Sequence, residues 1–393
     1  MRIVQITYRY RLEPGSGQTA VLARSAGARR WVWNWALSRK RAYYTLTGKG
    51  LTYHALAAAL TELKQQPATA WLRDIDSQLL QQALRDLETA FGNFFAKRAR
   101  FPRFRSIKRD TPRFRIPQRV AIAGQTIRVP KIGLIPARIH RPLAGTPKSA
   151  TFKREADGHW YVAIVAEQEV SAHTNRTPRT HVGVDLGLKS FAVLSTGETV
   201  DNPRVFRTQQ RKLARAGRAM SRKQRGSANR AKARAQVARL HAKIRQQRSD
   251  FLHKLTSRLV KSFDLISIED LSVRGLARTK LAKSVYDAAW GQFRTFLTYK
   301  ADRVDGYVQV IGRFYPSSRR CGACGAANHA LTLADRVWMC AQCGSTHDRD
   351  VNAAGNIDRE GVRLFMHHVA AGHAETQNAC RASVSPANAG KAR

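Results

Sequence analysis

The spacing of apolar residues divides the first half of the chain into stranded and helical regions. Residues 1–14 alternate apolar and polar positions, as a strand does, and Pro14 and Gly15 end that pattern. From about Thr19 to Lys97 the apolar residues recur every three or four positions, which predicts three or four helices. Residues 101–170 form short alternating runs broken by Pro and Gly, and we expect strands throughout them.

The second half begins with an apparent linker, SAHTNRTPRT, at residues 171–180. A hairpin is predicted over 181–198, because two apolar runs are separated by a turn around Gly187. A further apolar run follows at 263–276, and a helical pattern of small residues opens near Asp350. From about Gly372 onward the chain is rich in Ala, Asn and Ser, which predicts a disordered tail.

Composition identifies the kind of partner. The 393 residues include 69 Lys and Arg against 27 Asp and Glu, for a formal net charge of +42. Such an excess of positive charge requires a polyanionic partner, and nucleic acid is the partner expected by default. The chain is still 43% hydrophobic, so it can form a core, and its length suggests two or three domains.

The N-terminal segment, MRIVQITYRYRL, does not resemble a targeting peptide, and the sequence has no long apolar run. We therefore expect no membrane association. Of five cysteines, four form two close pairs, which favours a reducing cytoplasm and a metal site over disulfides.

One segment is far more basic than the rest. Residues 204–248 contain sixteen Lys or Arg and no acid, in a background rich in Ala, Gln and Leu that favours helix. Without acids there are no i,i+4 ion pairs, so we expect a phosphate backbone along this segment. Arg211, Arg222 and Arg234 are candidate contacts. The alternative is a solvated charged face.

The paired cysteines indicate zinc. Cys321 and Cys324 are separated from Cys340 and Cys343 by fifteen residues, and a glycine follows each pair. Two such CxxC turns can arrange four thiolates around one structural zinc ion, and the glycines suit the left-handed turn after each pair. A redox motif is the weaker alternative. The fifth cysteine, in the predicted tail, is given no role.

Acids lie in unusual surroundings at three places in this very basic chain. Asp185 interrupts the first apolar run of the predicted hairpin, and Glu269 and Asp270 end an apolar run within 263–276. Asp350 opens the last helical pattern. A carboxylate in an apolar strand is costly unless it is paired or bound to a cation, and converging carboxylates suit Mg²⁺. Taken singly, Asp185 could be a turn residue, and Glu269 or Asp270 could cap a helix.

The stretch THDRDVNAAGNI follows the second cysteine pair closely. Four thiolates already complete a tetrahedral zinc site, so His347, Asp348 and Asp350 are not needed as zinc ligands. We expect Asp348 to be a helix N-cap.

Together these motifs resemble the TnpB family of insertion-sequence-encoded nucleases, which are related to type V CRISPR effectors. The resemblance rests on GVDLG, ISIEDL, YPSSRRCGACG, CAQCG and HDRDVNAAGNI. It extends through GKGLTYHALAAALTELK, LETAFGNFF and FPRFR, and so covers nearly the whole chain short of the tail. GVDLG by itself would be a weak signal, because many RNase H-like proteins and actin-type kinases carry a similar run.

The resemblance implies an α+β multidomain protein with a RuvC-like, RNase H-type nuclease domain and an inserted zinc ribbon. A β-barrel-like wedge domain, interrupted by a helical recognition domain, would form the N-terminal half. The implied boundaries are 1–17 and 101–175 for the wedge domain, 18–100 for the recognition domain, 176–312 and 345–370 for the nuclease domain, 313–344 for the ribbon and 371–393 for the tail.

The resemblance also implies an RNA-guided DNA endonuclease of a bacterial transposon, with Asp185, Glu269 and Asp350 as the catalytic acids that bind Mg²⁺, two ions in all. Its partners would be a guide RNA from the transposon end and a double-stranded DNA target beside a short flanking motif, with one chain per RNA. The basic segment would face the guide–target duplex.

Base-reading residues are harder to assign. Tyr53 and Gln81 could read the flanking motif, since Gln can pair with adenine through two hydrogen bonds, and Arg349 could contact the scissile phosphate. For Tyr53 and Gln81 an ordinary surface or core role is the favoured alternative, and for Arg349 an ordinary surface role is an equal one. We expect core packing rather than base stacking for Trp31, Trp33 and Trp35.

Two other functions are compatible with the same residues. A transposase could use the same acids for strand transfer without a guide. A zinc-ribbon protein could bind nucleic acid as a regulator with no catalysis at all.

Overall fold

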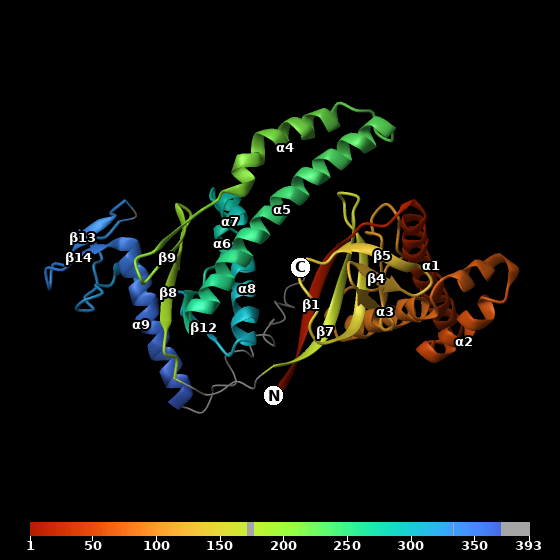
Figure 1. Cartoon of the computed structure of the whole chain (residues 1–393), viewed down its shortest axis with the longest axis horizontal. Helices are drawn as coiled ribbons and strands as arrows, with labels where there is room; N and C mark the ends of the chain where they lie inside the picture. The colour runs from red at the N-terminus through yellow and green to blue at the C-terminus, as the bar shows by residue number, and fades with distance from the viewer. Residues whose placement is uncertain (171–176, 333, 371–393) are drawn as a thin grey trace. The chain divides into compact units, whose positions relative to one another are not determined.

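The computed structural model describes residues 1–170, 177–332 and 334–370, and divides the chain into two compact units, Met1–Val170 and Ser171–Arg393 (Figure 1). The first six residues of the predicted linker and the predicted tail lie outside the described residues.

The first unit contains a seven-stranded antiparallel sheet in the order β2-β6-β7-β1-β5-β4-β3. The predicted N-terminal strand is confirmed as β1, which pairs with β7 on one side and β5 on the other. The strands are β1 (Arg2–Leu12), β2 (Arg113–Ile116), β3 (Ala121–Ala123), β4 (Thr126–Val129), β5 (Gly133–Arg138), β6 (Thr146–Arg154) and β7 (Trp160–Val170).

Helices occupy most of residues 16–95, between β1 and β2, as predicted. They are α1 (Ser16–Thr47), α2 (Tyr53–Leu63), the 3-10 helix η1 (Pro67–Asp74) and α3 (Ser77–Phe95). Their apolar faces share one hydrophobic core with the sheet. Trp33 is 2% exposed, and Trp31 and Trp35 pack against the same core, so the expected packing role of the tryptophans is confirmed.

The prediction of a strand over residues 101–112 was wrong. The Phe- and Arg-rich run FPRFR resembles a strand, but Phe101 and Phe104 are 47% and 45% exposed and no strand forms over these residues. Instead the backbone closes a turn, in which the Asp110 amide donates to the Ser106 carbonyl at 2.8 Å. The Asp110 carboxylate fixes this turn, since it accepts hydrogen bonds from the Ser106 amide and from the Arg103 side chain.

The second unit is built on a five-stranded sheet in the order β10-β9-β8-β11-β12. Its strands are β8 (His181–Leu186), β9 (Ser190–Leu194), β10 (Thr199–Asp201), β11 (Leu265–Glu269) and β12 (Tyr307–Ile311). β8 and β9 form the predicted hairpin, whereas β8, β11 and β12 run parallel. Parallel neighbours require crossovers, and helices supply them.

Helices cover both faces of this sheet (Figure 1). α5 (Ala228–Ser262) and α8 (Trp290–Arg303) pack on one face, and α9 (Arg349–Ala370) packs on the other. On the α5 side, Leu255 and Phe293 share a core with Val184 and Ile268. Side chains alternate across a strand, so the intervening residues of β8 and β11 face α9.

The α9 face is packed closely through small residues. A Cβ atom added to Gly183 of β8 would lie 2.0 Å from the Ala354 carbonyl oxygen. A Cβ atom added to Gly361 of α9 would lie 1.9 Å from Ser267 Oγ on β11. Only glycines at these two positions allow the helix to approach the sheet this closely.

The remaining elements connect these layers. The acid-free segment forms α4 (Val205–Ser221) and the first half of α5, which lie side by side as a helical hairpin (Figure 1). Shorter elements are α6 (Val273–Leu276), α7 (Ala282–Ala288), the 3-10 helix η2 (Ser317–Arg319), β13 (Val337–Met339) and β14 (Thr346–Asp348). Within the described ranges, every helix is too short or too polar to span a bilayer.

Candidate active site and zinc centre

The strand register brings Asp185 and Glu269 together. β8 and β11 are adjacent and parallel, with Ser267 beside Gly183 and Ile268 beside Val184. One step further, the same register sets Glu269 beside Asp185. Both residues belong to the alternate positions that face α9, and neighbouring strands lie about 4.8 Å apart. The two carboxylates therefore share one face at the carboxyl end of these strands.

α9 brings Asp350 to the same level. His181 Nδ1 lies 2.8 Å from Asp358 Oδ2, and Gly183 meets the backbone at Ala354. Two residues advance β8 by about 6.6 Å, and four residues advance α9 by about 6 Å. The two elements run in opposite directions, so each step of two residues along β8 corresponds to a step of four residues back along α9. The next step along this ladder pairs Asp185 with Asp350.

Electrostatics agree with this proximity. Asp185 is half-buried, and burial raises its pKa from 3.8 to about 7, with added repulsion from Glu269 and Asp350. Arg349 opposes the shift. Carboxylates that repel one another in a partly dry site are a suitable oxygen donor set for a hard divalent cation. The residues present therefore fit Mg²⁺.

The acids near Asp185 each have a different hydrogen-bond or ion-pair partner. Asp270 forms ion pairs with Arg294 at 3.0 Å and Arg313 at 2.6 Å, and α6 begins after Ser272, so Asp270 is not its cap. Glu269 accepts a hydrogen bond from the Ser317 hydroxyl at 2.5 Å. Asp350 lies 3.3 Å from an Arg336 nitrogen.

Asp348 is the N-cap that the sequence predicted. Its Oδ1 accepts hydrogen bonds from the amides of Asp350 at 3.0 Å and Val351 at 2.9 Å. This cap starts α9 one residue later, at Arg349, and fixes Asp350 in the first helical turn. Arg349 Nη1 donates to the Thr332 carbonyl at 3.1 Å, which holds that side chain towards the ribbon.

The four predicted zinc ligands lie together. The Sγ atoms of Cys321, Cys324, Cys340 and Cys343 are all within 4.8 Å of one another, so the cluster could hold a zinc ion. Gly325 and Gly344 have φ angles of +80° and +72°, the left-handed turns expected after each pair. Hydrogen bonds from Ser345 lower the pKa of the Cys343 thiol to about 6, which favours the thiolate that binds metal.

His347 lies beside this cluster without joining it. Its Nε2 atom is 3.0 Å from Cys321 Sγ, and its ring packs against Trp338 on the neighbouring strand. The cluster of mutually close ligand atoms contains the cysteines alone among the described residues. His347 is placed to hydrogen-bond a thiolate rather than to replace one.

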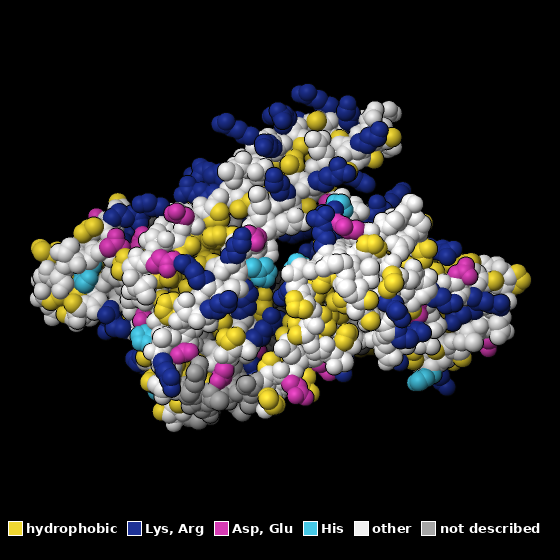
Figure 2. Space-filling model, in the orientation of Figure 1, with side chains coloured by type: hydrophobic (Ala, Val, Ile, Leu, Met, Phe, Trp, Pro, Cys, Tyr) yellow, Lys and Arg dark blue, Asp and Glu magenta, His cyan; other side chains and the backbone are white. Residues whose placement is uncertain are grey.

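The candidate nucleic-acid contacts are divided between the units. Arg211, Arg222 and Arg234 are all exposed on the α4–α5 hairpin, where Lys and Arg side chains gather (Figure 2). Gln81 is exposed on α3 of the first unit. Tyr53 begins α2, and its ring is half-buried with the Arg85 guanidinium 5.5 Å from its centre.

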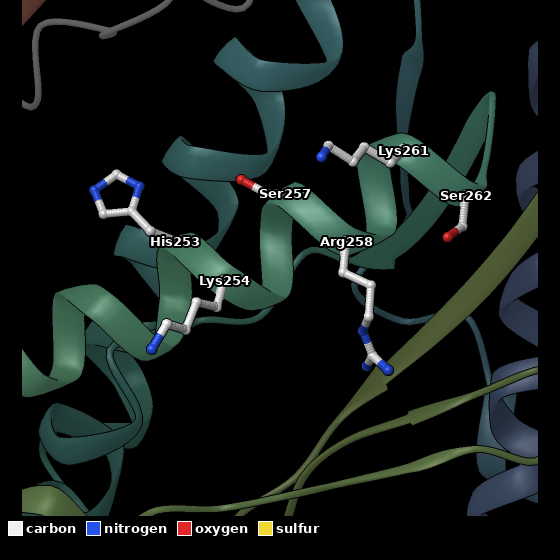
Figure 3. A pocket seen from close by; sticks show the side chains of 6 residues that line it. All are labelled: His253, Lys254, Ser257, Arg258, Lys261 and Ser262. Carbon is white, nitrogen blue, oxygen red and sulfur yellow. The ribbon is translucent and has the colours of Figure 1, made fainter. Parts of the chain in front are cut away.

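A cavity of about 590 Å³ lies away from the acids, along the last turns of α5 (Figure 3). Its cations are largely paired: Arg258 with Glu198 at 2.6 Å, and Lys254 with Asp250 at 2.8 Å. None of the three acids lines it. The lining residues are His253, Lys254, Ser257, Arg258, Lys261 and Ser262.

Sequence reasoning gave no role to Ser317, Asn352 and Asn356, although two quoted motifs contain them. The structure places Ser317 on Glu269 and both asparagines in the same network of hydrogen bonds. The sequence does contain one indication of this network. The two asparagines of VNAAGN are four residues apart and therefore share one helix face.

Comparison with known proteins identifies the family. Residues 163–280 match the IS605 OrfB family, described as a probable transposase, and residues 290–357 match the Cas12f1-like TNB domain. Residues 1–49 match the helix-turn-helix domain of the IS605 OrfB family. In the structure that last range contains β1 and the single long helix α1.

Two relatives match along most of their length. A Streptomyces pristinaespiralis protein, named as an RNA-guided DNA endonuclease, is 42% identical over 92% of this chain and 90% of its own. InsQ of Escherichia coli K12, which is named in the same way, is 36% identical over 93% of this chain and 92% of its own. The chain therefore belongs to the TnpB family of IS605 OrfB proteins.

A solved structure supports the fold. Cas12f1, in its complex with sgRNA and target DNA, superimposes with a TM-score of 0.52 at 11% identity, over 90% of this chain and 98% of that one. At that identity the likeness concerns the fold, which is a mixed α/β arrangement.

Proposed function

We propose that this protein is an RNA-guided DNA endonuclease of a bacterial transposon. The observation that carries the proposal is the convergence of Asp185, Glu269 and Asp350, in a chain whose relatives bear that name. The sheet order, with a hairpin followed by parallel strands and covered by helices on both faces, supports a RuvC-like, RNase H-type domain.

The three carboxylates would hold Mg²⁺, two ions in our proposal. When bound, these ions activate water and stabilise the leaving oxygen in phosphodiester hydrolysis. The role of the protein is to fix the oxygens: the parallel register sets Asp185 beside Glu269, and the Asp348 cap fixes Asp350. Arg349 begins the same helix, and we propose that it leaves the Thr332 carbonyl to contact a phosphate when nucleic acid binds.

The cysteine cluster would hold one structural zinc ion. Four thiolates leave no open position, so this centre would shape the ribbon rather than carry out chemistry. The ribbon joins β12 to α9 and therefore lies in sequence between two elements of the acid site.

RNA and DNA would be held chiefly through their phosphates. A net charge of +42 and the exposed arginines of the α4–α5 hairpin suit backbone contacts, while a guide RNA would supply sequence specificity by pairing. Guide RNA and double-stranded DNA are thus the proposed partners, with one chain per RNA. Gln81 and Tyr53 remain proposed readers of a flanking motif.

The test is cleavage of a plasmid library with a randomised flank. The purified protein is assayed with and without RNA transcribed from the transposon end, in Mg²⁺. We expect double-strand cuts that require the RNA and select a short flank. Equal cutting by protein free of RNA would contradict the guide and favour the transposase hypothesis. A regulator without catalysis would cut under neither condition.

A further inference from the structure

Glu269 has a partner that the proposed mechanism does not use. The Ser317 hydroxyl donates to Glu269 Oε1 at 2.5 Å, and Ser317 is only 6% exposed. Ser317 lies in η2, 48 residues further along the chain than Glu269 and four residues before Cys321, the first cysteine of the zinc cluster. A hydroxyl so enclosed has little freedom to leave the carboxylate.

Two asparagines of α9 hydrogen-bond to the backbone of the segment from Ser317 to Arg320. Asn356, 2% exposed, donates to the Ser317 carbonyl at 2.7 Å and to the Arg320 carbonyl at 2.6 Å. Asn352, one turn earlier, donates to the same Arg320 carbonyl at 2.8 Å. The carbonyls of Ser317 and Arg320 thus accept three hydrogen bonds from α9, and displacing the segment would break all three.

The zinc-binding loop is attached to the same helix. The Gly322 amide donates to Asn352 Oδ1 at 2.8 Å, and a Cβ atom at Gly322 would lie 2.7 Å from that oxygen. One hydrogen-bonded path therefore runs from the loop between Cys321 and Cys324, through α9, to the carboxylate of Glu269.

We propose that Ser317 is a positioning residue for Glu269, and that the asparagine pair of α9, Asn352 and Asn356, holds it in place. This inference rests on the proposed function, because it assigns Glu269 to the cation site. The hydroxyl occupies one carboxylate oxygen and so directs the other oxygen towards the cation. Partners of this kind, behind a metal ligand, typically change metal affinity or activity by 10–100-fold.

The chain offers a matched control in Ser318. It is the next residue, half-buried, and within the described residues its side chain makes no hydrogen bond. Ser317→Ala and Ser318→Ala therefore remove the same group from adjacent positions. Ser317→Thr and Ser317→Val form a second pair, equal in shape, in which only threonine keeps the hydroxyl.

Each variant is purified as the complex with transposon-end RNA, with zinc content and melting temperature recorded. Mn²⁺ binding is followed by electron paramagnetic resonance, and binding by the Asp185→Asn complex is subtracted as the contribution of RNA. Plasmid cleavage is then titrated with Mg²⁺.

We expect Ser317→Ala and Ser317→Val to weaken Asp185-dependent Mn²⁺ binding by about tenfold or more. The Mg²⁺ concentration for half-maximal cleavage should rise in parallel, while the rate at saturating Mg²⁺ recovers. Ser317→Thr and Ser318→Ala should stay close to the wild type, and all variants should keep their zinc.

Two results would overturn the inference while leaving the proposed function intact. In the first, Ser317→Ala matches Ser318→Ala although Asp185→Asn abolishes cation binding. In the second, Ser317→Thr and Ser317→Val are equally impaired, and both lose zinc or have a lower melting temperature, which would indicate a packing role for Ser317. If the wild type itself lacks Asp185-dependent binding, the proposed cation site fails, and this inference fails with it.

Discussion

Removing one charge from the acid site should stabilise the protein when Mg²⁺ is absent. Asp185 is half-buried, and its carboxylate is repelled by Glu269 and Asp350. Asparagine has nearly the same shape and no charge. The variant Asp185→Asn therefore isolates the electrostatic cost of the site, separately from any effect on catalysis.

The size of this cost follows from the pKa of Asp185, which rises from 3.8 to about 7. One pKa unit corresponds to about 1.4 kcal/mol, so the ionised group destabilises the fold by on the order of 4 kcal/mol. Between pH 3.8 and about pH 7, the folded protein keeps the Asp185 proton that the unfolded chain has released. Stability from this group is therefore lost as pH rises through that window, and is constant above it.

Urea unfolding of the second unit at pH 5 and pH 8 measures the effect. Both proteins are prepared free of Mg²⁺ but without a strong chelator, so that zinc is retained. The stability advantage of Asp185→Asn should widen by about 3 kcal/mol between these pH values. Adding Mg²⁺ at pH 8 should stabilise the wild type and leave the variant unchanged.

Asp201→Asn is the control, because Asp201 is exposed on β10 of the same sheet. It should show no such widening. Repulsion within the acid site would be contradicted if Asp185→Asn were no more stable than the wild type at pH 8 without Mg²⁺. Such a result would mean that the three carboxylates do not crowd one another.

Further predictions concern packing, zinc and phosphate contacts. Gly361→Ala should lower the free energy of unfolding by about 1–3 kcal/mol, because its Cβ would strike Ser267, as seen by urea denaturation. Gly355→Ala, on the same helix with open space around it, should instead stabilise by about 0.5–1 kcal/mol. Cys324→Ser should reduce zinc from about one ion per chain to near zero by atomic absorption; retained zinc would contradict the four-thiolate site. Arg211→Gln should reduce the slope of log affinity against log salt for RNA by about one, and Arg211→Lys should not.

The sequence predicted where the acids lie but not that they meet. Asp185 in a hairpin strand, Glu269 at a strand end and Asp350 at a helix start were all visible as local patterns. Their convergence depends on the register of β8 with β11 and on the close packing of α9, which are contacts between distant parts of the chain. Only the resemblance to a known family predicted that the three acids converge.

The same limit explains what sequence reasoning missed. Ser317 and Glu269 are 48 residues apart, and Asn356 reaches Arg320 across 36. A serine or asparagine acquires a role only from its partner, so local pattern cannot assign one. The run FPRFR wrongly predicted a strand at the start of residues 101–112, because a local pattern does not show whether a neighbouring strand is present.

Guided plasmid cleavage by variants of the three acids shows whether Asp185, Glu269 and Asp350 form one catalytic site. Asp185→Ala, Glu269→Ala and Asp350→Ala are compared singly and together, each with its RNA bound. Residues that act as one unit lose activity non-additively, so each single variant should fall by about 10³-fold or more, close to the triple variant. RNA binding should be unchanged. Guided cleavage retained by Asp185→Ala would contradict the central claim that these acids form one catalytic site.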